Sequence, residues 1–131
     1  MWIDTIEPII STRIDVMLKE KYSTKFPKLN TTTVDKQPKD PAFPSVYVHM
    51  LPILETGEDL EALTINAINC TMQVEVNTNT SQQDAKQIMS TVIEIMKKMR
   101  FRVQSGPQSQ NKETYRQVAR FTRVIGSGDV L

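Results

Sequence analysis

Three arginines near the end of the chain are the residues whose type and spacing most suggest a chemical role. Arg116, Arg120 and Arg123 alternate with aromatic and β-branched residues, a composition that favours a strand. Guanidinium groups bind carboxylates and phosphates through paired hydrogen bonds. Because side chains alternate across a strand, Arg116 and Arg120 are predicted on one face and Arg123 on the other, unless a bulge intervenes. This strand could bind single-stranded nucleic acid, or its arginines could be solvated or paired with nearby acids.

A cluster of acidic residues surrounds Gly57. It consists of Glu55, Glu58, Asp59 and Glu61, and we call it the acidic segment. Its spacing does not match the ligand positions of an EF-hand loop, so we predict no metal site there. We expect residues 54–63 to form an exposed acidic loop.

The other reactive side chains are two isolated ones, His49 and Cys70. A lone histidine cannot build a histidine-based metal site, and no nucleophile is marked for a catalytic triad. Cys70 is in phase with Met72 and Val74, which predicts a buried, inert thiol. A single cysteine excludes an internal disulfide and fits a reducing compartment. No glycine-rich phosphate loop occurs, so we expect no catalytic residues, no cofactor and no metal.

The net charge of +1 conceals a division along the chain. Residues 1–39 hold seven basic and five acidic side chains, residues 40–96 hold one and eight, and residues 97–131 hold eight and two. The three parts therefore carry net charges of +2, −7 and +6. Complementary charges orient association. The division could indicate a basic face for nucleic acid, or an acidic part of one copy that meets the basic part of another.

The length of 131 residues predicts a single domain over residues 1–131. No apolar run approaches the roughly 18 residues of a membrane span, so we expect no membrane partner. The N-terminus lacks a basic region followed by an apolar one, and we expect no signal peptide.

Hydrophobic periodicity predicts two helices and five strands. Apolar stripes predict one helix over 4–22 and another from the capping residue Ser81 to Arg100. The predicted strands cover 29–34, 45–51, 65–78, 101–104 and 114–125, with a Pro-rich loop at 35–44 and a turn-rich connection at 105–111. This order, α-β-β-β-α-β-β, predicts an α+β fold: a small, mostly antiparallel sheet with two helices packed on it.

Four segments, taken in their order and spacing, resemble one known family. They are Phe43–His49, Gln73–Asn77, Ile88–Val103 and Tyr115–Asp129. The strongest piece is an Arg-x-x-Arg strand, Arg120 to Arg123, that ends in Gly-x-Gly-Asp. Together these segments resemble the tail terminator, or tail-to-head joining, proteins of long-tailed bacteriophages, often labelled minor capsid or tail completion proteins. The resemblance spans about residues 1–129 of this chain.

The resemblance implies a virion structural protein and not an enzyme. Such proteins form a six-fold ring that stops growth of the tail tube and presents a surface to the head connector. The implied partners are other copies of the chain, the tail-tube protein and the head connector or completion protein. Genome DNA would pass through the ring without specific binding. The implied location is the head-proximal end of the phage tail, after assembly in the host cytoplasm.

A head-to-tail ring brings two unlike surfaces into contact. We predict that the acidic segment of one copy supplies one surface and that Arg116, Arg120 and Arg123 of the next supply the other. Other interpretations remain open. Both surfaces could be merely solvated, the chain could be a small nucleic-acid-binding module that uses its basic C-terminal strand, or it could be a head-completion or connector protein.

Overall fold

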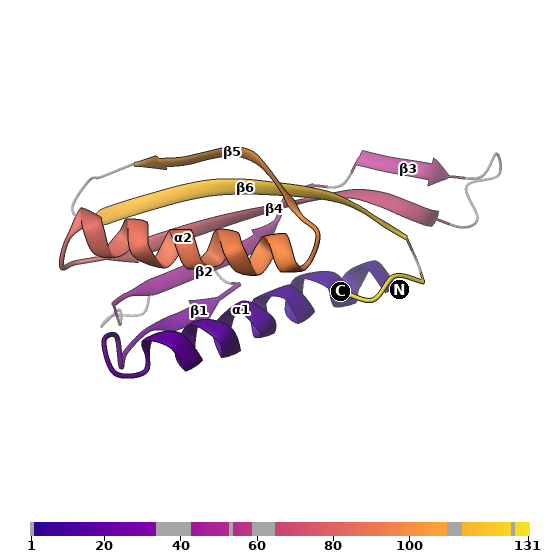
Figure 1. Ribbon diagram of the computed structural model, residues 1–131. Helices are drawn as coiled ribbons and strands as arrows, with labels where there is room; N and C mark the ends of the chain where they lie inside the picture. Colours follow the sequence, from indigo (N-terminus) through magenta and orange to yellow (C-terminus); the bar gives the residue numbers. More distant parts are fainter. Residues whose placement is uncertain (1, 34–42, 53, 59–64, 110–113, 127) are drawn as a thin grey trace.

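The chain folds into a sheet with two helices packed against one of its faces (Figure 1). The computed structural model describes residues 2–33, 43–52, 54–58, 65–109, 114–126 and 128–131. In chain order the elements are the 3-10 turn η1 (Trp2–Thr5), α1 (Ile6–Tyr22), β1 (Asn30–Thr32), β2 (Ser45–Met50), β3 (Leu54–Glu58), β4 (Ile65–Thr78), α2 (Gln82–Lys98), β5 (Arg102–Ser109) and β6 (Tyr115–Gly126). Most of the predicted Pro-rich loop at 35–44 lies outside the described residues.

The sheet is mixed. Its strands lie in the order β1-β2-β4-β6-β5, and β3 pairs with β4. The α+β class and the two helices on the sheet are confirmed, but the sheet is not the mostly antiparallel one that was predicted. β1 runs parallel to β2, whereas the other pairings are antiparallel. A parallel pair needs a connection of about a dozen residues, and residues 33–44 between β1 and β2 provide that length.

Two stretches that were predicted as connections contain strands. Residues 54–58, expected in an exposed loop, form β3, which pairs with the first residues of β4. β5 continues to Ser109, although residues 105–111 were expected to turn. Its pairing with β6 shifts register between Val103 and Ser105 and again between Ser105 and Gln108. Gly and Pro in this stretch therefore mark a bulged edge strand, which is one of the places where a sheet tolerates them.

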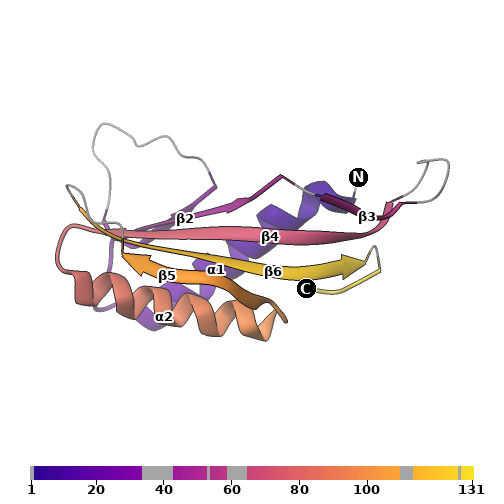
Figure 2. The ribbon, with the colours of Figure 1, turned by 90° about the horizontal axis from the view of Figure 1, so that it is seen from above.

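The two longest strands, β4 and β6, form the centre of the sheet. They pair antiparallel from Ala67 opposite Gly126 to Thr78 opposite Tyr115. Figure 2 shows β2, β4, β6 and β5 side by side, with β3 at one end of the sheet. Alternate residues of β4 are fully buried and face the helices, and these are Ile68, Cys70, Met72, Val74, Val76 and Thr78. The predicted period of two along this strand is thus confirmed.

The helices divide the covered face between them. α1 contacts β1 and β2, whereas α2 contacts β4, β5 and β6. Of the predicted stripe of α1, Ile6, Ile10, Ile14 and Leu18 are buried, whereas Met17 is half-buried. The stripe of α2 is also buried, namely Ala85, Ile88, Met89, Val92, Ile95 and Met96. Burying each such aliphatic side chain contributes about 1.5–3 kcal/mol, so this core holds both helices on the sheet.

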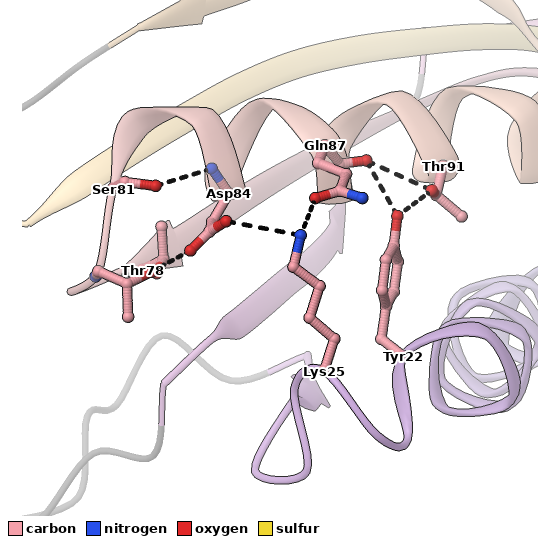
Figure 3. Close-up of polar contacts among 8 residues, drawn as sticks. Tyr22, Lys25, Thr78, Ser81, Asp84, Gln87 and Thr91 are labelled. Atoms are coloured by element: carbon pink, nitrogen blue, oxygen red, sulfur yellow. Dashed lines mark hydrogen bonds and ion pairs between the residues drawn. The ribbon is translucent and has the colours of Figure 1, made fainter.

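Polar contacts fix the start of α2 and join it to the end of α1 (Figure 3). The predicted cap is present, because the Ser81 hydroxyl accepts a hydrogen bond of 3.1 Å from the amide of Asp84. The Tyr22 hydroxyl lies 2.6 Å from that of Thr91 and donates to the Gln87 carbonyl oxygen at 3.3 Å. Lys25, just beyond α1, donates to Gln87 Oε1 at 2.5 Å. The two helices therefore meet at this end through hydrogen bonds as well as apolar packing.

Candidate functional site: the open face of the sheet

The face of the sheet that points away from the helices is polar, and we call it the open face. Its residues alternate with the buried ones along β2, β4 and β6. Residues opposite one another on neighbouring strands share a face. One row across the open face is His49, Gln73, Arg120 and Ser105, and the next is Tyr47, Glu75, Val118 and Gln108. The two helices thus leave one face on which polar groups from four strands come together.

A chain of hydrogen bonds crosses the open face from β6 to β4 and back. Arg120 Nε donates to Gln73 Oε1 at 2.9 Å, and Gln73 Nε2 donates to Glu75 Oε1 at 3.1 Å. Arg116 Nη2 donates to the same oxygen of Glu75 in an ion pair. Glu75 is buried although it lies on the open face, and a buried carboxylate requires such partners. The Arg116 guanidinium therefore contacts the Glu75 carboxylate directly, whereas that of Arg120 is linked to it through Gln73.

The three predicted arginines are not equivalent. Arg116 is paired with Glu75. Arg120 is exposed and bonds Gln73 through Nε only, so within the described residues its two terminal nitrogens have no hydrogen-bond partner. Arg116 and Arg120 lie on the same face, as predicted. Arg120 is therefore the arginine of this strand that presents donors to a ligand.

Arg123 lies on the other face of β6, in agreement with the predicted alternation. Its side chain is only 9% exposed. Nη1 donates to the carbonyl oxygen of Met99 at 2.9 Å, and Nη2 lies 3.6 Å from Asp129 Oδ2. Asp129 in turn accepts a hydrogen bond from the amide of Gly126. Arg123 thus ties the end of α2 to the C-terminal turn. Its guanidinium is therefore not available to bind another molecule in the way the sequence predicted.

The described part of the acidic segment lies at one end of the sheet. Glu55 and Glu58 belong to β3, where they pair with Ile68 and Ile65, whereas Asp59 and Glu61 lie outside the described residues. Arg120 pairs with Gln73 much farther along β4. Within the described residues, therefore, Glu55 and Glu58 are not brought to Arg120 in the same chain.

His49 and Cys70 occupy different environments. The His49 ring stacks on Tyr47 with centroids 4.4 Å apart, and its Nδ1 is buried without a hydrogen-bond partner among the described residues. Cys70 is buried on the helix side of β4. Burial raises the pKa of its thiol to about 11, although the nearby charge of Arg123 acts to lower it. A thiol with this pKa stays protonated and is a poor nucleophile at neutral pH.

A polar hollow beside Arg120 was missed by the sequence analysis. It has a volume of about 290 Å³. Its lining comes from three strands and comprises Gln73, Ser105, Gly106, Gln108, Val118, Ala119 and Arg120. It lies where the register of β5 shifts against β6. Gly106 and Pro107 are the residues in the sequence that could have indicated a bulged strand here, but they are equally typical of a turn, which is what the sequence predicted.

A second hollow, of about 600 Å³, lies on the outer side of α1. It is mainly apolar and is lined by Pro8, Ile9, Thr12, Arg13, Val16 and Met17. Ile9 is 43% exposed and Val16 is 55% exposed. These two residues lie seven positions apart and outside the buried stripe of α1. That spacing puts them on one helix face, and it could have been noticed in the sequence.

Comparisons with known proteins add no family assignment. No protein-family model matches the chain, and no curated protein matches it. Among the described residues, no three His, Cys, Asp or Glu side chains are grouped as metal ligands would be. No helix in the described part of the chain has the length and apolar character to cross a membrane.

Proposed function

We propose that this protein is a virion structural component that caps a phage tail tube as a ring and presents the surface for head-to-tail joining. The observation that carries the proposal is how the four family-like segments are arranged in the fold. They contain most of β2, part of β4, most of α2 and all of β6. β2 pairs with β4, β4 pairs with β6, and α2 packs on both central strands. Segments scattered along the sequence thus form one contiguous structural unit.

The distribution of surfaces supports a ring of copies. A ring closed by rotation needs two unlike patches on each subunit. The chain offers a polar open face with Arg120 on β6, an acidic segment that begins in β3, and an apolar hollow on α1. Exposed ion pairs contribute only about 0–1 kcal/mol each. Charge would therefore select the register, and apolar contacts such as the α1 hollow would supply most of the affinity.

Electron microscopy of infected-cell lysates tests the proposal. A phage that lacks the gene should produce filled heads beside unjoined tails of wrong or unregulated length, because an uncapped tube has no surface for the connector. Supplying the wild-type gene in trans should restore joined virions. Normal joined virions without the gene would refute the proposal. His49→Ala and Cys70→Ser should both restore joining if they fold, since neither residue has a chemical role in it.

A further inference from the structure

The polar hollow beside Arg120 has the features of a socket for a single carboxylate. Gln73 accepts from Arg120 Nε and is itself oriented by its bond to Glu75. This arrangement fixes the guanidinium while leaving its terminal nitrogens for another group. Ser105 and Gln108 line the same hollow from β5, and each carries a side-chain donor. No acidic side chain is among the residues that line it.

We propose that this hollow receives a carboxylate from the acidic segment of a second copy of the chain. The inference rests on the proposed ring and identifies one of its contacts. An arginine and a carboxylate can form two parallel hydrogen bonds, which fix orientation as well as add attraction. The charges are complementary, because residues 40–96 carry a net charge of −7 and residues 97–131 carry +6.

Glu55 and Glu58, the members of the acidic segment that the structure describes, lie too far along the sheet to reach the hollow of their own chain, so we assign the carboxylate to another copy. Glu55 lies opposite Ile68 and Glu58 opposite Ile65, whereas Arg120 lies opposite Gln73. These separations are five and eight residues along β4. At about 3.3 Å per residue they correspond to roughly 17 and 26 Å, well beyond the reach of a glutamate side chain.

The structure favours a protein carboxylate over the backbone of a nucleic acid. Non-specific nucleic-acid binding needs several basic groups and exposed aromatic rings on which bases can stack. Of the three arginines on β6, Arg116 is paired with Glu75 and Arg123 is tied to Met99 and Asp129. Phe121 is buried, and the Tyr47 ring already stacks on His49. Tyr115 is 39% exposed, but it lies opposite the buried Thr78, on the other face of the sheet from Arg120. Arg102 of β5 is exposed on the same face as Arg120, opposite Thr122, but it does not line the hollow. A guanidinium held beside a small hollow suits a single carboxylate better than a string of phosphates.

Zero-length cross-linking of the full-length protein tests the contact. Arg120→Lys places an amine at the socket, which a carbodiimide can join to a carboxylate in direct contact. In an equal mixture of ¹⁵N-labelled and unlabelled Arg120→Lys protein at high concentration, we expect mixed-isotope peptides that link position 120 to the acidic segment. Arg100→Lys is the matched control, at an exposed arginine beyond the end of α2, and should give no such link. Absence of the link at position 120, or an equal yield from the control, would overturn the proposal.

Two further readouts separate this inference from its alternatives. Arg120→Glu should impair joining of heads to tails in the complementation assay, and adding Glu58→Lys and Asp59→Lys to the same chain should restore part of it. If the gene proves essential for joining but the Arg120→Glu protein supports normal joining, the proposed carboxylate contact is wrong, whereas the proposed ring is not contradicted. If Arg120→Gln instead lowers the salt dependence of single-stranded oligonucleotide binding by about 0.7 in the log–log slope, and Arg100→Gln does not, the hollow binds phosphate and the inference fails.

Discussion

The guanidinium of Arg123 donates a hydrogen bond to the carbonyl oxygen of Met99 across 2.9 Å. Met99 is the C-cap residue of α2, where carbonyl groups lack partners within the helix. A side chain from the central strand β6 therefore supplies a donor to the C-terminal end of the helix that covers it. The contact explains how an arginine can be almost wholly buried on the helix side of the sheet.

Removing this contact should destabilise the fold. Arg123→Ala leaves the Met99 carbonyl without this donor and Asp129 without its cation, so we expect a loss of about 1–3 kcal/mol in unfolding free energy. Urea denaturation followed by circular dichroism measures it. Arg120→Ala on the same strand is the control and should change stability by less than about 0.5 kcal/mol, because that side chain is exposed. Similar losses in both variants would contradict the assigned role of Arg123.

Glu75 and Arg116 should show energetic coupling in a double-mutant cycle. Removing one partner of a fully buried ion pair costs about 3–5 kcal/mol. The Arg116 side chain is 29% exposed and its partner 10%, so solvent screening lowers the expected coupling to about 1–2 kcal/mol. The cycle compares Glu75→Gln, Arg116→Gln and the double variant by urea denaturation. Additive effects within experimental error would show that the pair contributes nothing to stability.

The contact between α1 and α2 gives a third prediction. Tyr22→Phe removes the hydroxyl that meets Thr91 and the Gln87 carbonyl, while the ring remains packed. Because Thr91 keeps its own bond to that carbonyl, we expect a modest loss of about 0.5–1.5 kcal/mol. Tyr115→Phe is the matched control at a residue that is 39% exposed. An equal effect at both positions would mean that the hydroxyl does not join the helices.

Most of the elements could be predicted from the sequence because their apolar periodicity is regular. β4 was predicted with its observed bounds, and the cap of α2 at Ser81 was predicted with its partner Asp84. β3 was missed because Glu55, Gly57 and Glu58 have low strand propensity. Only its pairing with β4 makes this segment extended, and long-range pairing leaves no local signal in the sequence.

The candidate site was predictable only in part. Alternation placed Arg116 and Arg120 on one face and Arg123 on the other, as observed. What alternation could not give is the partner of each arginine, since Glu75, Gln73 and Met99 come from other elements. The bulge in β5 that forms the hollow depends on how β5 pairs with β6. Gly106 and Pro107 are visible in the sequence, but the register of that pairing is not, so the hollow could not be predicted.

Cys70 should react slowly with thiol reagents in the folded protein. Its thiol has a pKa of about 11 because it is buried, compared with about 8.5 for a free cysteine. Ellman's reagent at pH 8 should therefore label the folded protein far more slowly than the urea-unfolded protein. Rapid labelling without denaturant would show that the thiol is accessible and that its environment has been misjudged.

The same pKa makes a prediction about stability at high pH. A group whose pKa is higher in the folded state binds its proton more tightly there. Its contribution to the free energy of unfolding is therefore complete below its pKa in the unfolded state, and it is lost as the pH rises through its pKa in the folded state. Relative to Cys70→Ala, the wild type should lose stability between about pH 9 and 11. Urea denaturation of both proteins across this range isolates Cys70 from other groups. A constant difference would show that its pKa is not raised.

Replacing Gly106 with alanine should destabilise the fold, whereas replacing Gly128 should not. Gly106 has a φ of +83°, a conformation that costs other residues about 1–2 kcal/mol. A Cβ atom there would also lie 2.6 Å from the Val118 carbonyl oxygen, closer than atoms can approach, whereas a Cβ at Gly128 meets nothing within 4 Å. Gly106→Ala should therefore lower the unfolding free energy by at least about 1–2 kcal/mol, and Gly128→Ala should change it by less than about 0.5 kcal/mol. Because Gly106 also lines the hollow beside Arg120, Gly106→Ala introduced into the Arg120→Lys protein should reduce the intermolecular cross-link even where that protein remains folded. Equal stability of the two alanine variants would show that β5 does not approach β6 as closely as described.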